Sequence, residues 1–439
     1  MKIKNEKYFP PLKFLLPFIT MVSFLHSDSN AQKMKTRFAT TADVVIDSAK
    51  RRIASKSCSQ SSSYIPDTLH PELTPMRYVR INIHVIQDAQ GQNNFSGPEG
   101  RKWIQGIVES ANYRLAHNQK MFLPHGNNTP VLQIPFRYVL TGDPHNPDDD
   151  GIYFHRDDSL FCMNKKAIGK QRNNVYDPRQ YETYGVQKDS VINIFMIEHC
   201  PDSIKSRTYN PSNDGVGTGN WAKIVGCYNI MKHPTVFQPG DTFKFSPWDA
   251  SALFNHELGH CLGLSHTWNQ EDGCPDTPLN PGCWNFNSPS GCQDVSNNVM
   301  DYNNYKDAYS PYQIGKVCLN FYNERGSRKY LEPQWCSYDS SKSITIHAGE
   351  SIEWPGSIDV FGDLIVENNA TLTVHCILSI PPSGKIMLYP KATLILDGCL
   401  VTSRCTGSFD GIEIMTRKKN KPMIHLMNGT VIQNVKHPL

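Results

Sequence analysis

Apolar side chains recur with two different periods in the first half of the chain, and each period predicts a different element. From residue 79 to 85 every second residue is apolar, which is typical of a strand with one buried face. Between residues 104 and 115 apolar residues return every three or four positions, which predicts a helix. Apolar runs at 136–140 and 191–197 predict further strands. The order strand, helix, strand, strand predicts an α/β (α+β) domain in which a helix backs a twisted sheet.

A different pattern begins near Cys336, where short apolar stretches repeat. Residues 362–366 recur as 384–388, and residues 370–374 recur as 392–396, so both offsets are 22 residues (384 − 362 and 392 − 370). Short strands at a fixed period suggest a β-solenoid, in which each turn buries its apolar face against the next. An ordinary β-sandwich with chance similarity is the alternative. We therefore expect an all-β domain over residues 336–439.

The N-terminus has the order of a secretory signal peptide. Several lysines precede a short apolar run at residues 14–25, and the small residues Ser29 and Ala31 follow it. A membrane anchor is the alternative, but a spanning helix needs about 20 apolar residues. We expect residues 1–31 to be the signal peptide. Residues 32–75 are rich in Ser, Thr and charge without a sustained period, which predicts a pro-segment or linker rather than a folded unit.

Composition and charge exclude several classes of protein. A length of 439 residues allows two or three domains, and 39% hydrophobic residues fit a globular chain. The 44 basic and 41 acidic residues are spread along the chain, so we expect no nucleic-acid partner, and the basic cluster at 417–421 is interpreted as a solvated loop. No second segment is long enough to span a membrane, so we expect a secreted protein. Its 13 cysteines predict several disulfides and, because the number is odd, one further thiol.

The segment before residue 262 predicts a helix that carries two metal ligands. Ser246 can cap a helix and Pro247 suits its first position, so the helix is expected over residues 248–262. His256 and His260 are four residues apart and therefore project from the same helix face. Two imidazoles one turn apart can bind one zinc ion.

The residues around this pair predict a catalytic rather than a structural zinc site. Glu257 follows the first histidine, which is the position of a general base that acts on a zinc-activated water. Gly263 lets the chain turn sharply out of the helix and brings His266 round as a third ligand. Three protein ligands leave the fourth zinc position for water.

Two motifs in this region resemble those of a known family. Residues 256–266 fit H-E-x-x-H-x-x-G-x-x-H, and Met300 lies in a downstream Asn-Val-Met-Asp-Tyr sequence. The chain thus resembles the metzincin zinc peptidases, and its loop at 272–278 is similar to that of the pappalysin family. The resemblance spans about residues 79–320, with its specific motifs at 256–302.

The resemblance implies a metzincin catalytic domain, which we assign to residues 76–335, and roles for two further residues. Met300 would form a Met-turn, a hydrophobic floor beneath the zinc ligands. Tyr302 would lie near the zinc and stabilise the oxyanion, with core packing as the alternative. Family members often carry an acidic and cysteine-containing cluster just after the Met-turn, which residues 303–309 lack. That difference bears on substrate preference and on one disulfide.

Relatives of this type bind calcium, so the resemblance also implies a second metal. Asp272, Asp276 and the Thr277 carbonyl could supply hard oxygen ligands to Ca²⁺. A solvated acidic turn is the alternative for this loop.

The cysteines near the motifs have different expected roles. Cys261 points away from the two helix histidines, so we expect it to be buried and not a ligand. At least one local disulfide is expected among Cys274, Cys283 and Cys292. The Cys58 thiolate could occupy the open zinc position in a latent precursor, and a disulfide or an unimportant thiol is the alternative.

Together these features predict a secreted zinc-dependent endopeptidase that acts on protein or peptide substrates. The alternatives are an adhesive or scaffold protein with a vestigial peptidase domain, and a zinc hydrolase that acts on a non-peptide bond. The intact histidine set and Glu257 favour an active peptidase. The sequence does not identify a partner for the C-terminal domain.

Overall fold

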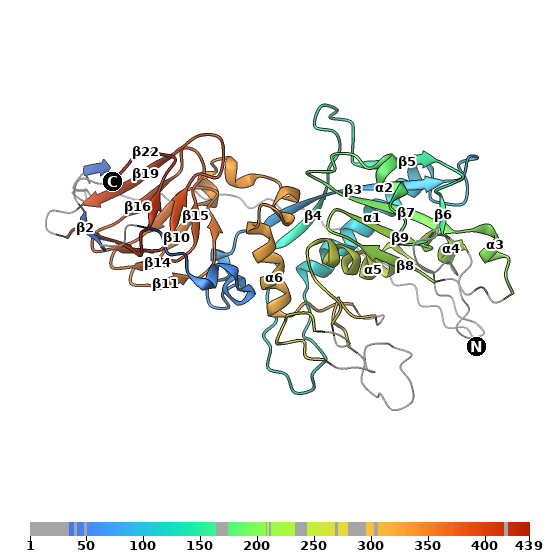
Figure 1. Cartoon of the computed structure of the whole chain (residues 1–439), viewed down its shortest axis with the longest axis horizontal. Coiled ribbons are helices and arrows are strands. Elements are labelled where there is room, and N and C mark those ends of the chain that lie inside the picture. Colours follow the sequence, from blue (N-terminus) through green and yellow to red (C-terminus); the bar gives the residue numbers. More distant parts are fainter. Residues whose placement is uncertain are drawn as a thin grey trace, which may run out of the picture.

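The computed structural model places two bodies end to end, with helix α6 (Pro311–Tyr322) between them (Figure 1). It describes residues 35–38, 42–47, 51–163, 174–207, 209, 212–232, 244–267, 271–279, 296–302, 306–416 and 420–439. The predicted signal peptide, Cys283, Cys292 and most of the basic cluster at 417–421 lie outside the described residues. None of the described helices is both long enough and apolar enough to cross a membrane.

The first body contains a mixed sheet that confirms the predicted α/β architecture. In the described chain this sheet has seven strands in the order β4-β3-β7-β9-β8, with β5 paired to β3 and β6 paired to β7. All these pairs are parallel except β8 with β9. The predicted strands at 79–85, 136–140 and 191–197 correspond to β3, β4 and β7. The strands are β3 (Arg77–Gln87), β4 (Phe136–Leu140), β5 (Ile152–Arg156), β6 (Cys162–Met163), β7 (Ile192–His199), β8 (Asp214–Gly217) and β9 (Trp221–Val225).

Helices cover this sheet and carry the predicted metal motif. Helix α1 is the predicted helix, and it buries the expected face at Ile104, Ile107, Val108, Ala111 and Leu115. It packs beside α5, which carries two of the predicted metal ligands. The helical elements of this body are α1 (Gly97–Ala116), α2 (Arg179–Tyr184), α3 (Pro201–Ile204), α4 (Cys227–Lys232), α5 (Pro247–Cys261), α6, η4 (Ser327–Tyr330) and η5 (Gln334–Cys336).

The second body is built from parallel strands that pair with the strand three positions later in the chain. Among the described residues these strands form three sheets, ordered β10-β13-β16-β19, β11-β14-β17-β20 and β12-β15-β18-β21, with β22 beside β19. The 22-residue offset reappears as strand register, because Leu364 pairs with Ile386 and Leu372 pairs with Leu394. The apolar side chains of each turn are buried against those of the next.

The regular elements of the second body have these bounds: η6 (Ser340–Lys342), β10 (Ile344–Ile346), β11 (Ser351–Trp354), β12 (Ile358–Asp359), β13 (Leu364–Val366), β14 (Thr371–Val374), β15 (Ile377–Ser379), β16 (Lys385–Leu388), β17 (Thr393–Asp397), β18 (Leu400–Thr402), β19 (Phe409–Thr416), β20 (Met423–Met427), β21 (Val431–Ile432) and β22 (Val435–His437). Every regular element that the structure describes after Lys342 is therefore a strand.

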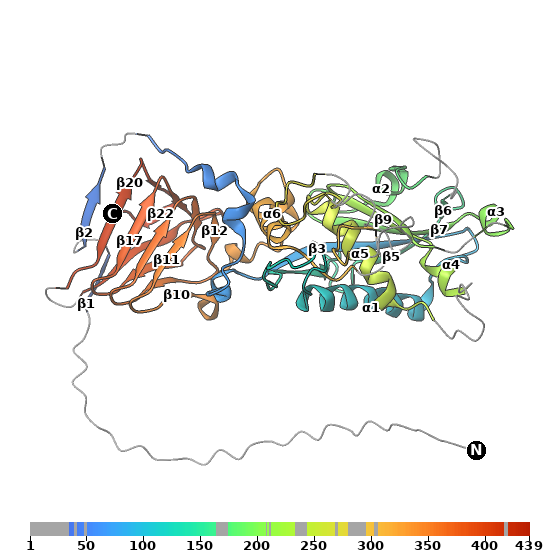
Figure 2. The ribbon, with the colours of Figure 1, turned by 90° about the horizontal axis from the view of Figure 1, so that it is seen from below.

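The N-terminal segment packs along the second body, as Figure 2 shows. Its described part contains paired strands and 3₁₀ turns, and the assignment of residues 32–75 as a pro-segment or linker stays a prediction. Strand β1 pairs antiparallel with β19, and β2 pairs parallel with β20. Cys58 forms a disulfide with Cys376, 318 residues away. The partners of this segment lie near the other end of the chain, so its local sequence does not reveal the pairing. Its elements are β1 (Lys35–Phe38), β2 (Asp43–Ile46), η1 (Lys56–Ser59), η2 (Ser61–Tyr64) and η3 (Pro71–Leu73).

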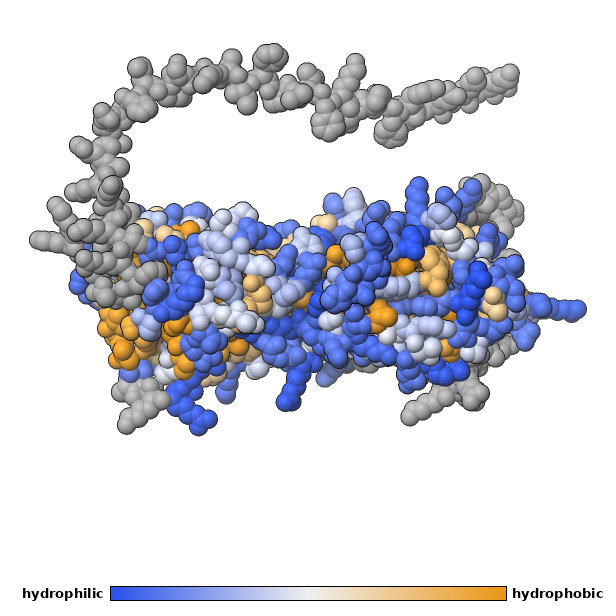
Figure 3. Space-filling model, turned by 90° about the horizontal axis from the view of Figure 1, so that it is seen from above, coloured by the Kyte–Doolittle hydropathy of each residue, from blue (hydrophilic) through white to orange (hydrophobic). Residues whose placement is uncertain are grey.

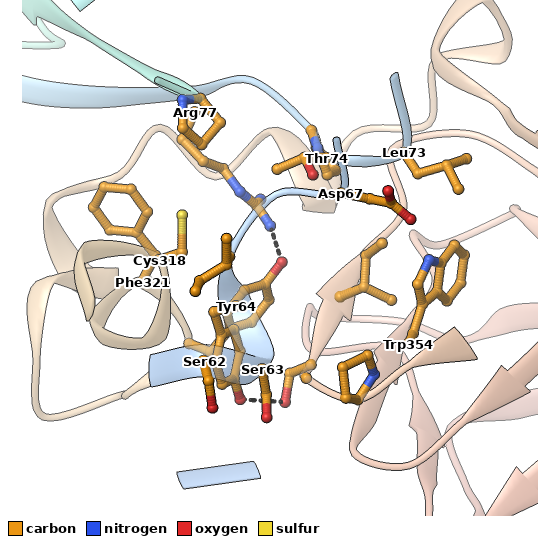
Figure 4. A pocket seen from close by; sticks show the side chains of 18 of the residues that line it. Ser62, Ser63, Tyr64, Asp67, Leu73, Thr74, Arg77, Cys318, Phe321 and Trp354 are labelled. Carbon is orange, nitrogen blue, oxygen red and sulfur yellow. Dashed lines mark hydrogen bonds between the residues drawn. The ribbon is translucent and has the colours of Figure 1, made fainter. Parts of the chain in front are cut away.

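A cavity of about 280 Å³ lies where the N-terminal segment, α6 and the second body meet (Figure 4). Tyr64, Arg77 and Trp354 are among the side chains that line it. The Arg77 guanidinium donates a hydrogen bond to the Tyr322 hydroxyl at 2.9 Å. The cavity thus lies beside the buried contacts that join the two bodies.

A buried ion cluster and a disulfide fix the two bodies to each other. Arg77 and Arg328, both from the first body, donate to the carboxylate of Asp359 in β12 at 2.8 and 2.9 Å. The Asp359 side chain is fully buried, and both arginines are 4% exposed. A disulfide between Cys336 and Cys405 ties the end of the first body to the second.

Exposed apolar side chains gather at the end of the second body that lies farthest from the first (Figure 3). Strand β2 stands last in its sheet order, after β20. Among the described residues no further strand covers β2, which leaves apolar side chains of these two strands exposed: Val44, Val45, Ile46, Met423 and Met427.

Candidate metal centre

Helix α5 begins where the sequence predicts, and its first turn is capped. The Asp249 carboxylate accepts hydrogen bonds from the Ser246 backbone N–H at 2.8 Å and from the Ser246 hydroxyl at 2.6 Å. Pro247 occupies the first helical position, where its missing N–H leaves no unmet hydrogen bond. This cap fixes the start of the helix that carries His256, Glu257 and His260.

The three predicted histidine ligands converge on one point. The Nε2 atom of His266 lies 3.2 Å from that of His256 and 3.0 Å from that of His260. Nitrogen ligands about 2.0–2.1 Å from a tetrahedral zinc lie roughly 3.3 Å from one another, so the spacing fits zinc. Within the described ranges, no other group of three or more His, Cys, Asp or Glu side chains converges in this way.

Backbone carbonyls orient two of these imidazoles toward the common point. His256 Nδ1 lies 2.7 Å from the Val299 carbonyl, and His260 Nδ1 lies 2.9 Å from the Leu264 carbonyl. A ring nitrogen that donates to a carbonyl carries the proton, so Nε2 keeps the lone pair that a metal needs. Burial lowers the pKa of all three histidines, and that of His266 falls to about 4, which favours the neutral, metal-binding form.

Glu257 is buried beside the histidines and lies against the edge strand β8. Its side chain is so close to Gly215, and its backbone to Gly217, that a Cβ atom at either glycine would overlap it. Gly215 therefore makes room for the carboxylate, and Gly217 makes room for the backbone of α5. Burial raises the pKa of Glu257, and the charge of Lys306 opposes that rise.

Gly215, Gly217 and Lys306 are site residues that the sequence analysis did not single out. The Gly-x-Gly spacing at 215 and 217 was the available signal for a close approach of two backbones. Lys306 is 9% exposed, and its positive charge acts on Glu257 and on all three histidines. Nothing in its local sequence distinguishes it from a surface lysine.

Met300 and Tyr302 both lie close to the histidine-bearing segments. Met300 is fully buried, and its sulfur packs against Gly259 of α5, the residue before His260. The Tyr302 hydroxyl lies 2.8 Å from Nδ1 of His266, and the side chain is 43% exposed. This exposure contradicts the alternative that Tyr302 packs in the core.

The loop at residues 272–278 packs against the first half of α6. Asp272 accepts hydrogen bonds from the Cys274 N–H and the Thr277 hydroxyl at 2.9 and 2.8 Å. Asp276 accepts from the Ser310 hydroxyl and the Tyr312 N–H at 2.7 and 3.0 Å. Asp272 and Thr277 are buried, whereas Gly273, Pro275 and Pro278 are exposed, so the loop is only partly solvated. Both carboxylates are satisfied by protein donors, and calcium binding here stays a prediction.

The described cysteines are either disulfide-bonded or buried as free thiols. Cys261 is buried and its thiol faces the Trp221 carbonyl at 3.4 Å, so it is not directed at the histidines. Cys58 is disulfide-bonded, which contradicts a latent state in which its thiolate binds zinc. Cys162 pairs with Cys200. Cys274 is among the buried free thiols, and its expected partners Cys283 and Cys292 lie outside the described residues.

Comparison with known proteins gives weak matches. No family model and no curated protein matches the chain. Among solved structures, mature mirolysin of Tannerella forsythia in complex with a cleaved peptide is 17% identical, with a TM-score of 0.38, over 58% of this chain and 95% of that one.

Two further structures match at a similar level. Mirolysin in complex with compound 9 is 16% identical, with a TM-score of 0.39, over 58% of this chain and 96% of that one. A mutant promirolysin of T. forsythia is 16% identical, with a TM-score of 0.36, over 59% and 85%. These similarities are too low to identify a family or an activity.

Proposed function

We propose that this protein is a secreted zinc-dependent endopeptidase of metzincin type, similar to the pappalysins. The observation that carries the proposal is the convergence of three imidazole Nε2 atoms beside a buried glutamate. Three nitrogen ligands suit a catalytic zinc, because a structural zinc is almost always bound by four protein ligands. His256, His260 and His266 would hold the ion.

The zinc ligands, Glu257 and Tyr302 would each have a different role in peptide hydrolysis. Zinc bound here would polarise the scissile carbonyl and lower the pKa of a water to roughly 7. Glu257 would accept the proton of the attacking water and deliver it to the leaving amine. Tyr302, whose hydroxyl lies beside His266, would donate a hydrogen bond to the developing oxyanion.

The neighbouring edge strand supports a peptide as the substrate. Strand β8 stands at the edge of the described sheet, and its residues 215–217 lie directly against Glu257. An extended peptide can add to such an edge through backbone hydrogen bonds. This addition would bring a peptide bond to the metal without a requirement for a particular side chain. The edge strand therefore favours peptide hydrolysis over the hydrolysis of a small non-peptide bond.

We further propose that the second body is a β-solenoid attached to the peptidase. The support is the parallel pairing of each strand with its counterpart one repeat later. The disulfides Cys58–Cys376, Cys162–Cys200 and Cys336–Cys405 support export, because such bonds persist in oxidising compartments. An adhesive role with a vestigial peptidase domain would not need His256, Glu257 and His260 to be oriented as they are.

Incubation of the purified protein with a reduced, unfolded protein tests this function. We expect cleavage at internal peptide bonds, read by mass spectrometry of the products. A zinc chelator should stop the cleavage, because Glu257 alone cannot activate water sufficiently. Cleavage that continues unchanged in the chelator would contradict a metallopeptidase, and an inactive protein that binds zinc would favour the vestigial alternative.

A further inference from the structure

Helix α6 directs two amide side chains toward the metal centre although it carries no ligand. Gln313 and Asn320 are seven residues apart, which is about two helical turns, so they lie on the same side of α6. Each contacts a different segment that leads to a histidine. Neither residue belongs to the motifs that define the site in the sequence.

Gln313 is linked to His256 through the Met-turn. Its side chain exchanges two hydrogen bonds with the Asn298 amide, at 2.9 and 3.0 Å, and both residues are fully buried. The same Asn298 oxygen accepts the Met300 backbone N–H at 2.9 Å. Val299 lies between these two fixed residues, and its carbonyl is the partner of His256 Nδ1. Gln313 thereby sets the position of that carbonyl.

Asn320 is linked to His260 through the turn that follows α5. Its amide donates to the Leu262 carbonyl at 2.8 Å. Gly263 has a φ of +95°, and a Cβ atom there would overlap the Asn320 amide. The turn is therefore in close contact with this side chain. The Leu264 carbonyl, next along the turn, is the partner of His260 Nδ1. Asn320 thereby fixes the turn that orients the second histidine.

We propose that Gln313 and Asn320 are positioning residues that hold His256 and His260 in metal-binding orientation. The inference rests on the proposed zinc site. Gln313 acts through Asn298 on the neighbouring Val299 carbonyl, which is the partner of His256. Asn320 acts through the Leu262 carbonyl on the turn that carries the Leu264 carbonyl, which is the partner of His260. Loss of a group that hydrogen-bonds a metal ligand directly typically weakens metal binding by about 10–100-fold, and Gln313 and Asn320 hold such groups in place. Helix α6 would thus determine the orientation of two of the three histidine ligands.

Zinc affinity and coordination geometry test this role independently of catalysis. The variants are Gln313→Met, which keeps the length of the side chain, and Asn320→Ala, at a half-buried position that tolerates truncation. Matched controls on or next to the same helix are Lys316→Met and Asn323→Ala. Lys316 donates to the Asp272 carbonyl, and Asn323 is exposed at the helix end, so neither contacts a segment that orients a histidine.

Zinc affinity is measured by competition with a chromophoric chelator, and geometry by the absorption spectrum of the Co²⁺-loaded protein. We expect both variants to bind zinc about 10–100-fold more weakly than wild type and to shift the Co²⁺ spectrum. The controls should match wild type in both measurements, whatever their melting temperatures.

Two results would overturn the inference in different ways. If Gln313→Met and Asn320→Ala bind zinc as tightly as wild type and keep its Co²⁺ spectrum, the two amides stabilise the fold only. If wild type itself does not bind zinc, the proposed function fails, and the positioning role fails with it. If Gln313→Met does not fold, Asn320→Ala decides the question alone.

Discussion

Replacement of Glu257 by Gln is expected to slow the cleavage of an unfolded protein by about 10²–10⁴-fold, the usual contribution of a general base. Gln has nearly the same shape and so fits the space that Gly215 leaves, but it cannot accept the proton of the attacking water. The rate is measured with saturating zinc. Zinc content should stay at the wild-type level, because Glu257 is not one of the converging ligands.

The matched control for this variant is Glu109→Gln on the exposed side of α1. It makes the same chemical change away from the metal centre and should keep the wild-type rate. A Glu257→Gln variant that retains full activity would exclude Glu257 as the general base. Loss of zinc together with activity would instead show that the variant disturbs the metal site itself.

Replacement of Asp359 by Ala is expected to lower the free energy of unfolding by about 3–5 kcal/mol, because the buried guanidinium groups of Arg77 and Arg328 lose their counter-charge. The ion cluster joins the two bodies. The variant should therefore lose the contact between them at a lower urea concentration than wild type. The measurement is the unfolding midpoint, followed by intrinsic fluorescence. Trp335, which stacks on the Arg328 guanidinium, lies within the cluster and reports its disruption.

An exposed carboxylate provides the control for this stability measurement. Asp202 lies in the first turn of α3 and has an exposed side chain, so Asp202→Ala should leave the midpoint nearly unchanged. If Asp359→Ala unfolds at the same urea concentration as wild type, the buried ion cluster does not hold the bodies together. The Cys336–Cys405 disulfide and the N-terminal segment would then carry that role.

The part of the candidate metal centre that comes from one short stretch of sequence was predictable. His256, Glu257 and His260 lie on one helical turn, and the Gly263 turn brings His266 back within ten residues, so spacing alone indicates their convergence. The strands β3, β4 and β7 were predictable for the same reason, because period-2 or continuous apolar runs mark a strand without knowledge of its partners.

The residues that complete the site were not predictable, because they act across long separations. His256 meets the Val299 carbonyl 43 residues away, and Asn320 meets the Leu262 carbonyl across 58 residues. Gln313 and Lys306 look like ordinary helix-cap and surface residues in the sequence. Their roles become visible only in the folded structure, where α6 and the Met-turn lie beside α5.

The position of the N-terminal segment was also not predictable, because its contacts are with residues more than 300 positions away. Its strand β2 reads Asp-Val-Val-Ile, which does not alternate between apolar and polar residues, and all four side chains are exposed. It is ordered by pairing with β20, which lies near the other end of the chain. A second long-range contact, the Cys58–Cys376 disulfide, occupies the Cys58 sulfur, which is why the latent-cysteine hypothesis fails.

Zinc titration of the metal-stripped protein tests the central claim most directly. The rate of cleavage of an unfolded protein is followed as zinc is added, with His260→Ala as the variant that lacks one ligand. The proposed site predicts that activity is absent without metal, rises with zinc to a plateau at one ion per chain, and stays absent in His260→Ala. Activity in the metal-free protein, or equal restoration of the His260→Ala variant, would contradict a zinc peptidase centred on these three histidines.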